Sequence, residues 1–304
     1  MLQRDTDFIF KICYFLNFMN NFFQISDLSK YDINTILEMV VSSKILVGKN
    51  IGLLFEKYST RTRLSFSVGI YNMGGNSIDL RFSELNISRE ESFEDTFRAF
   101  NCYLDGLIYR TTDHQKLITA SQYFEKPIIN ALSDVSHPCQ ILSDLLTLKE
   151  QFGSLEIHIL WMGDMNNVTY SLVEAANLID EINLTICAPK QISSLINWKM
   201  NSNIEVVSNL ESIDLGQVIC VMTDVFISMN DEDSEDKISL LKPYIVNSEL
   251  MSKTASDSIF MHCLPAKVGL EVSEEVFRSS KSIVWRQAYN RMVAQQKLLQ
   301  FIYQ

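Results

Sequence analysis

The sequence predicts an α/β protein with two doubly wound domains, each a parallel sheet flanked by helices, and an active-site cleft between them. Two observations lead to this fold class. Short apolar runs typical of buried strands alternate with longer segments of helical periodicity along most of the chain. Polar clusters follow most of these runs, and in open parallel sheets the ligand crevice lies at that carboxyl edge. We therefore expect the clusters to meet in one cleft.

The first half of the chain alternates regularly. We expect a first helix at 33–43, introduced by a cap at Ser26 or Asp27, and strands at 51–55, 77–80, 106–109 and 127–130. Helices are predicted at 62–73 and 93–102, and the polar segment 82–92 is predicted to be a mobile loop.

The second half repeats the alternation. A long helix at 138–151 bridges the halves, and strands are expected at 157–162, 184–187, 218–222 and 259–262. The helix predicted at 287–303 is expected to pack back on the first half. The predicted domains are therefore 19–136 joined by 287–304, and 137–286.

One apolar stretch near the N-terminus could be mistaken for a membrane or export segment. Residues 8–23 are short for a span, are interrupted by Lys11 and Asn17, and lack a small-residue cleavage site. We reject a membrane role. Met19 is a plausible natural start, so residues 1–18 are expected to be an extension without catalytic work.

Composition excludes several classes of function. The chain has 304 residues, 47% of them hydrophobic and 21% charged, which is a globular profile. Its net charge of −11, without a basic stripe, argues against nucleic acid and leaves anionic substrates to local arginines. The six cysteines form no C-x-x-C pair, so we expect reduced thiols in a cytoplasmic protein.

The motif STRTR, residues 59–63, lies between a predicted strand and a predicted helix. Free N–H groups at a helix start favour a dianionic group, hydroxyls can donate to it, and an arginine fork matches phosphate. The motif lacks the Gly-rich loop and Lys of a nucleotide-binding P-loop. An N-capped helix with solvated arginines is the alternative interpretation, but the whole stretch favours a phosphate site.

Two further clusters follow predicted strands. His137 and Gln140 flank Pro138 at a helix start, where both could donate to a carbonyl oxygen, although such a His is often an ordinary cap. Cys263 follows the last strand, either as a small buried hydrophobe or as a thiolate with a tuned pKa, and no spacing makes it a protease nucleophile.

The segment after the strand at 218–222 suits an amino acid. Asp224 and Ser228 could bind an α-ammonium group and Asn167 a carboxylate, although a capped turn explains Asp224 and Ser228 equally well. The acidic segment 230–236 is more typical of a solvated loop or lid than of a metal site. The motif GDMNN lacks the G-x-G-x-x-G pattern of dinucleotide-binding folds, which disfavours hydride transfer.

From about Phe22 onward, the sequence resembles the aspartate/ornithine carbamoyltransferase family. The resemblance rests on seven motifs in the family's order: FEKYSTRTRLSF, ESFEDTFRAF, HPCQILSDLLTLKE, GDMNNV, DVFISM, MHCLPA and QAYNRMVAQ. HCLP together with D-x-x-x-S-M points to ornithine rather than aspartate as the second substrate. The resemblance implies a carbamoyl phosphate-binding domain followed by an ornithine-binding domain, and transfer of a carbamoyl group to the ornithine δ-amine, giving citrulline and phosphate.

The resemblance also implies roles for individual residues. It implies that carbamoyl phosphate is bound by Ser59, Thr60, Arg61, Thr62, Asn86, Arg110, His137, Gln140, Cys263, Leu264 and Arg291. It implies that ornithine is bound by Asn167, Asp224, Ser228 and Met229, and that catalysis depends on Arg110, His137, Asp224 and Cys263. No metal or organic cofactor is implied.

The family forms trimers in which a loop of one subunit completes its neighbour's site, and here that loop is LNISREES with Asn86. The sequence departs from the family pattern at Tyr58, Ser67, Asn230 and Tyr289. Two other interpretations therefore stay open: a carbamoyltransferase acting on another amine, such as an acylated ornithine or putrescine, and a non-catalytic paralogue.

Overall fold

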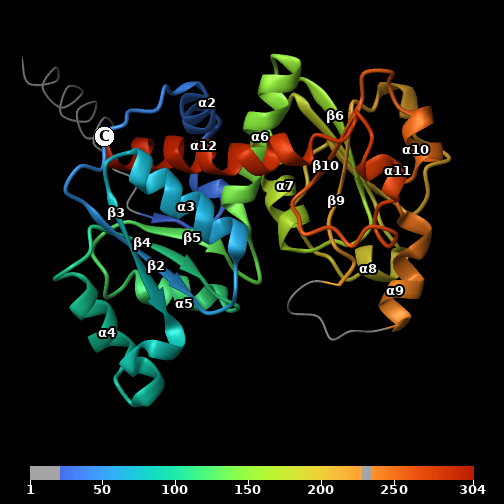
Figure 1. The fold of residues 1–304 in the computed structure, drawn as a ribbon. Helices are drawn as coiled ribbons and strands as arrows, with labels where there is room; N and C mark the ends of the chain where they lie inside the picture. The colour runs from blue at the N-terminus through green and yellow to red at the C-terminus, as the bar shows by residue number, and fades with distance from the viewer. Residues whose placement is uncertain (1–20, 228–234) are drawn as a thin grey trace, which may run out of the picture.

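A computed structural model describes residues 21–227 and 235–304 of the chain. The predicted extension 1–18 and the predicted ornithine ligands Ser228 and Met229 lie outside these residues, as does Asn230. Within them the structure has two parallel five-stranded sheets with helices packed around them, which confirms the predicted fold class (Figure 1).

The first sheet has the strand order β1-β5-β4-β2-β3. Its strands are β1 (Asn21–Phe22), β2 (Asn50–Phe55), β3 (Asn76–Arg81), β4 (Gly106–Arg110) and β5 (Ile128–Leu132). The helices of this half are α2 (Lys30–Glu38), α3 (Thr60–Asn72), α4 (Phe93–Phe100) and α5 (His114–Ala120). The central strands β2 and β4 are almost wholly buried, as their continuous apolar runs predict.

The second sheet has the order β10-β9-β6-β7-β8. Its strands are β6 (Ile157–Met162), β7 (Ile182–Cys187), β8 (Ile204–Val207), β9 (Cys220–Thr223) and β10 (Ile259–His262). The helices of this half are α7 (Asn167–Leu178), α8 (Lys190–Ser193), α9 (Glu235–Leu241), α10 (Ser248–Lys253) and α11 (Glu274–Phe277). In each sheet the chain first adds strands on one side of a central strand, β2 or β6, and then crosses over to add strands on its other side. A crevice opens at the carboxyl edge of the sheet where this change of direction occurs.

Two long helices join the halves. Helix α6 (Pro138–Phe152) follows β5 and leads into β6, and α12 (Val284–Tyr303) ends the chain. Figure 1 shows α12, in red, running from the second sheet across α6 to the first half, where it packs against α3 and α2. One continuous hydrophobic core therefore extends from Phe22 in β1 to Met261 in β10.

Several predicted boundaries were wrong for identifiable reasons. Helix α2 begins at Lys30 because Ser29 and Asp32 form a capping box, so neither Ser26 nor Asp27 is its cap. Helix α3 begins at Thr60, so most of the STRTR motif is the first turn of a helix rather than a loop. Segment 82–92 contains two short 3-10 turns, at Phe82–Glu84 and Asn86–Arg89. The elements that were not predicted are strands β1 and β8 and helices α5, α7, α8, α9, α10 and α11.

The rejected membrane segment, residues 8–23, lies mostly outside the described residues, so its rejection stays a prediction. No helix in the described ranges is long and apolar enough to cross a bilayer. The five cysteines at positions 102, 139, 187, 220 and 263 are all free thiols.

Candidate active site

A cavity of about 870 Å³ lies where the carboxyl ends of the two sheets face each other. Its walls include most of the residues that the sequence singles out as ligands. From the first half come Ser59, Thr60, Arg61, Thr62, Arg110 and His137, and from the second half come Asn167, Asp224, Cys263, Leu264 and Arg291. The clusters that lie far apart in the sequence therefore do meet in one cleft.

The N-terminus of α3 forms one side of the cavity. Ser59 is the N-cap residue, yet its hydroxyl makes no capping bond and instead accepts a hydrogen bond from Arg110 Nη1 at 3.3 Å. The backbone N–H groups of the first turn are consequently not capped by a side chain, and the helix dipole adds positive potential at the same place. This geometry suits a phosphate group.

The two arginines of the STRTR motif have different surroundings. Arg61 lines the cavity. Arg63 instead forms an ion pair with Asp79 on β3, with Nη1 and Oδ2 3.0 Å apart, and is not among the lining residues. The alternation follows from helical geometry, because residues two apart on a helix point to different sides. One motif therefore contains both a candidate ligand and a structural arginine.

Glu56 holds the end of β2 in place behind this helix. Its carboxylate accepts hydrogen bonds from Tyr109 Oη at 2.7 Å, from Thr111 Oγ1 at 3.0 Å and from Lys116 Nζ at 3.0 Å. Because these donors lie on β4, just after β4 and on α5, Glu56 fixes the turn that follows β2 relative to Arg110. The role of Glu56 was not predicted, because its hydrogen-bond partners lie more than 50 residues away in the sequence.

Arg110 and Arg291 form a buried cationic wall beside His137, and all three side chains are less than a tenth exposed. Burial, together with repulsion from Arg291 and Arg61, lowers the pKa of Arg110 to about 10. Burial also lowers the pKa of Arg291, and burial plus the two arginines holds the pKa of His137 well below its usual value. His137 is therefore neutral at physiological pH, with one ring nitrogen able to donate, while an anion in the cavity would offset the clustered charge.

Gln140 lies behind this wall and does not line the cavity. It is fully buried on α6; its Oε1 accepts from Arg291 Nη1, and its Nε2 donates to Asp144 Oδ1 at 2.8 Å. In this arrangement one of the two N–H groups of the Gln140 amide donates to Asp144, and the predicted donation from Gln140 to a carbonyl oxygen stays a prediction. The orientation is unambiguous, since a guanidinium can only donate.

Arg291 reaches the cavity from the C-terminal helix. Its Nη2 donates to Thr62 Oγ1 at 2.7 Å, so the guanidinium lies between the start of α3 and Gln140 of α6. A planar group held at both ends in this way needs little further ordering to bind an anion or a polarised carbonyl.

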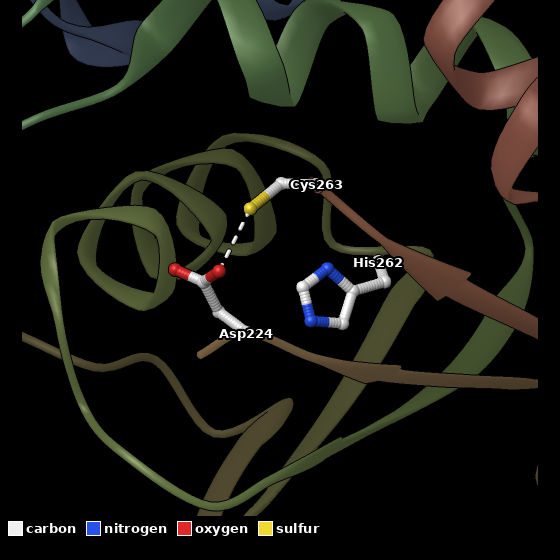
Figure 2. A group of neighbouring side chains, drawn as sticks. All are labelled: Asp224, His262 and Cys263. Carbon is white, nitrogen blue, oxygen red and sulfur yellow. Dashed lines mark hydrogen bonds between the residues drawn. The ribbon is translucent and has the colours of Figure 1, made fainter. Parts of the chain in front are cut away.

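Asp224 and Cys263 also line the cavity, and they form a hydrogen-bonded pair (Figure 2). The Cys263 Sγ donates to Asp224 Oδ1 at 2.9 Å, and Asp224 Oδ2 accepts from Asn166 Nδ2 at 2.8 Å. Burial and the Asp224 carboxylate raise the pKa of Cys263 well above its usual value. Of the two interpretations of Cys263, the structure favours a protonated thiol that donates a hydrogen bond over a reactive thiolate.

His262 lies beside this pair (Figure 2). Asp224, His262 and Cys263 each offer an atom that could coordinate a metal ion, and these three atoms lie within 4.8 Å of one another. Both ring nitrogens of His262 are already engaged, however. Nδ1 accepts from the Leu264 backbone N–H at 2.9 Å, and Nε2 faces Glu271 Oε1 at 3.1 Å. The imidazole therefore shapes the loop that carries Leu264, whose backbone has a positive φ of 57°.

Two of the four predicted ornithine ligands, Asn167 and Asp224, lie within the described residues, and both line the cavity. Asn167 lines the cavity from the first turn of α7, and its Nδ2 donates to the Ser133 carbonyl at 2.6 Å. Lys237 of α9 and Asp164 also line the cavity, joined by an ion pair of 2.9 Å. This pair was not predicted, because Lys237 follows an acidic stretch and only Asn167 of the GDMNN motif was considered as an amino-acid ligand.

Asn86 lies away from the cavity of its own chain. It is exposed at the start of the second 3-10 turn and is not among the lining residues.

The fold and the site together define a class: a two-domain α/β protein with an arginine-lined anion site in the cleft and a carboxylate–thiol pair facing it. Family models agree with this class. Residues 20–150 match the carbamoyl-P binding domain of aspartate/ornithine carbamoyltransferase, and residues 155–302 match its Asp/Orn binding domain. The chain belongs to the aspartate/ornithine carbamoyltransferase family.

Individual relatives are similar over nearly the whole chain. Ornithine carbamoyltransferase from Methanosphaera stadtmanae is 40% identical, covering 94% of this chain and 99% of the relative. The enzyme of that name from Rhizobium meliloti is 36% identical, with coverages of 92% and 97%. The solved structure of ornithine carbamoyltransferase from Pyrococcus furiosus superposes with a TM-score of 0.84 at 32% identity, covering 92% of this chain and 96% of that one.

Proposed function

We propose that this chain is an ornithine carbamoyltransferase, which transfers the carbamoyl group of carbamoyl phosphate to the δ-amine of L-ornithine and releases L-citrulline and phosphate. The observation that carries the proposal is the meeting of Arg61, Arg110 and Arg291 with the Asp224–Cys263 pair across one cavity. Relatives that cover almost the whole chain and bear this name support it.

The first half supplies the phosphate site, and residues of both halves surround the carbamoyl group. The N-terminus of α3, with Ser59, Thr60, Arg61 and Thr62, binds the phosphate, and Arg110 reaches both the phosphate and the carbamoyl oxygen. His137, Arg291, Cys263 and the backbone of Leu264 surround the carbamoyl group, with Gln140 one side chain behind Arg291. We assign residues 19–136 with 287–304 to this domain and 137–286 to the ornithine domain.

The second half supplies the amino-acid site. Asn167 and Asp224 lie on the cavity wall, where an amide and a carboxylate suit the carboxylate and ammonium of a free amino acid. Ser228 and the backbone of Met229 complete this site in the proposal. Asp224 and Cys263 orient the side-chain amine, whose lone pair must point at the carbamoyl carbon.

The chemistry forms one C–N bond and breaks one C–O bond. The neutral δ-amine attacks the carbamoyl carbon, negative charge grows on the carbonyl oxygen, and the C–O bond to phosphate breaks with its electron pair leaving on phosphate. Arg110, His137 and Arg61 are fixed donors that stabilise this charge without reorganising. The ammonium proton of the substrate must be lost before attack, and phosphate can take the proton released afterwards.

The departure from the family pattern at Tyr289 does not disturb the cavity wall, and the departure at Asn230 lies outside the described residues. Tyr289 is half exposed, its ring stacks with the Arg286 guanidinium at 5.4 Å, and it does not line the cavity. The ligand set around Arg291 is complete without it. This favours a catalytic protein over a binding paralogue.

A ureido-group assay tests the activity. Purified protein is incubated with carbamoyl phosphate and one amine from a panel: L-ornithine, L-aspartate, an N-acylated ornithine or putrescine. Product from ornithine alone is the expected result. Product from another amine in place of ornithine would identify a sister carbamoyltransferase, and no product from any amine would favour a non-catalytic paralogue.

We also propose a cytoplasmic homotrimer with shared active sites. The exposed position of Asn86, away from its own cavity, supports the sharing, since its predicted contact with substrate then comes from a neighbour. Mixing Arg61→Ala and Asn86→Ala subunits after dissociation is expected to restore activity, because some mixed sites regain both native residues. Mixtures no more active than either parent would contradict shared sites.

A further inference from the structure

A buried carboxylate that no substrate can touch lies directly behind the cationic wall. Asp144 is 1% exposed on α6 and is not among the cavity residues. Its Oδ1 accepts two hydrogen bonds of 2.8 Å, from Gln140 Nε2 and from Gln287 Nε2. Its Oδ2 has no hydrogen-bond partner in the described part of the chain.

The side-chain amides of Gln140 and Gln287 connect Asp144 to residues of the cavity wall. Gln140 turns its oxygen to the Arg291 guanidinium, and Gln287 turns its oxygen to the backbone N–H of His262 at 2.9 Å. Since one carboxylate oxygen takes both amide N–H groups, each amide has a single allowed orientation. Asp144 therefore acts on Arg291 from one side and on the residue before Cys263 from the other.

We propose that Asp144 is a positioning residue, which fixes the side-chain amide of Gln140 and thereby holds Arg291 in place against the carbamoyl group of the bound substrate. This inference rests on the proposed function. An apolar side chain of similar size would pack here at a lower cost in stability, because burying a carboxylate with one unpaired oxygen is unfavourable. Burial, opposed by the hydrogen bonds of Gln287 and Gln140, raises the pKa of Asp144 to about 7, which expresses that cost.

The proposal predicts selective damage to carbamoyl recognition. Phosphate binds at the start of α3, which Asp144 does not contact, whereas Arg291 faces the carbamoyl group. In Asp144→Leu the affinity for carbamoyl phosphate is expected to fall about tenfold, as the loss of one coupled contact to a charged group would produce. The affinity for inorganic phosphate is expected to stay within about twofold of wild type, as for an independent site.

Titration calorimetry with carbamoyl phosphate and with inorganic phosphate measures both affinities. The matched control is Thr147→Val, one turn along α6, which removes a buried hydrogen bond of 3.0 Å from Asn290 of α12 without touching Gln140. It should lower thermal stability and leave the ratio of the two affinities unchanged. An equal loss of both affinities in Asp144→Leu would overturn the proposal.

A double-mutant cycle tests the route through Gln140. If Asp144 acts on Arg291 through this amide, Asp144→Leu in a Gln140→Ala background is expected to cause a much smaller loss of carbamoyl phosphate affinity than in wild type, limited to the route through Gln287. Additive losses would refute the mechanism. Should Asp144→Leu fail to fold, Asp144→Ser is used with the same expectation, since its hydroxyl is too short to reach both amides.

A conservative variant separates positioning from packing. Asp144→Asn keeps an acceptor oxygen and should bind carbamoyl phosphate within about threefold of wild type. A loss as large as that in Asp144→Leu would contradict the acceptor role. Citrulline formation by the wild type tests the proposed function separately: a wild type that binds carbamoyl phosphate but forms no citrulline refutes that activity, while the binding ratios still decide the role of Asp144.

Discussion

Arg291 and Thr62 lie 229 positions apart in the sequence, and the guanidinium Nη2 of Arg291 donates to the hydroxyl of Thr62 over 2.7 Å. This bond joins the last helix of the chain to the first turn of α3, where the phosphate is proposed to bind. Thr62 is buried, so water cannot replace it as the acceptor. The position of one substrate-facing arginine thus depends on a residue of the phosphate motif.

Replacing Thr62 by Val tests this dependence. The variant keeps the shape of the side chain but removes the acceptor, and hydrogen bonds to charged groups contribute about 1.5–3 kcal/mol. Affinity for carbamoyl phosphate is expected to fall about tenfold or more. Isothermal titration calorimetry measures it, and wild-type affinity in a folded Thr62→Val variant would show that the bond does not matter.

Arg61→Ala and Arg63→Ala form a matched pair within one motif. Arg61 lines the cavity, so its loss should abolish measurable binding of carbamoyl phosphate while circular dichroism shows an intact fold. Arg63 pairs with Asp79 outside the cavity, so its loss should change affinity by less than about threefold, as for a partly exposed ion pair. Retained binding in Arg61→Ala would exclude it as a phosphate ligand.

Cys263 is expected to resist alkylation. Burial and Asp224 raise the pKa of its thiol well above the usual value, so little thiolate forms near neutral pH. Exposed Cys102 provides an internal comparison in the same molecule. Mass spectrometry after treatment with iodoacetamide at pH 7.5 should show Cys102 modified first. Equal or faster modification of Cys263 would mean that its thiolate is populated.

The rate of chemistry should rise from pH 6 to pH 9 in single-turnover experiments. Only the neutral δ-amine of ornithine attacks, so its deprotonation controls the rate. His137 does not contribute to this rise, because burial and two arginines hold its pKa well below the usual value and it is already neutral. His137→Gln should therefore be slower but keep the same profile. A flat wild-type profile would count against attack by the free amine.

The stability of the protein should depend on Asp144 with a definite sign. Burial raises its pKa from 3.8 to about 7, so the folded state binds a proton more tightly than the unfolded state. Stability is therefore lost as the pH rises from about 4 to 7, by up to (7 − 3.8) × 1.4, or about 4 kcal/mol. Urea unfolding at pH 5 and pH 8 should show that Asp144→Asn gains on wild type at the higher pH. A constant difference would place the carboxyl pKa near its ordinary value.

The alternation of elements was predictable because buried parallel strands such as β2 and β6 are continuous apolar runs. The position of the cleft followed from the polar residues at the ends of those strands. The start of α2 was missed although its signal, Ser29 with Asp32 three residues later, is local and readable. That error came from choosing the wrong cap, not from missing information.

The orientation of Gln140 could not be predicted, for a different reason. It is decided by Asp144 on the same helix and by Arg291 on a helix 151 residues away. Lys237 and Asp164 likewise meet only after the second sheet has formed, 73 residues apart in the sequence. Pairings of this kind depend on tertiary packing, and no local pattern encodes them.

Because α12 carries Arg291 and also covers α3 and α6, the order of synthesis limits when the site can exist. During synthesis on the ribosome, the residues of both sheets are made before α12 and its Arg291. The growing polypeptide can therefore assemble the motif at residues 59–63 without the ability to hold its ligand fully. Complete substrate capture is therefore expected only after α12 has been made and has packed on α3 and α6.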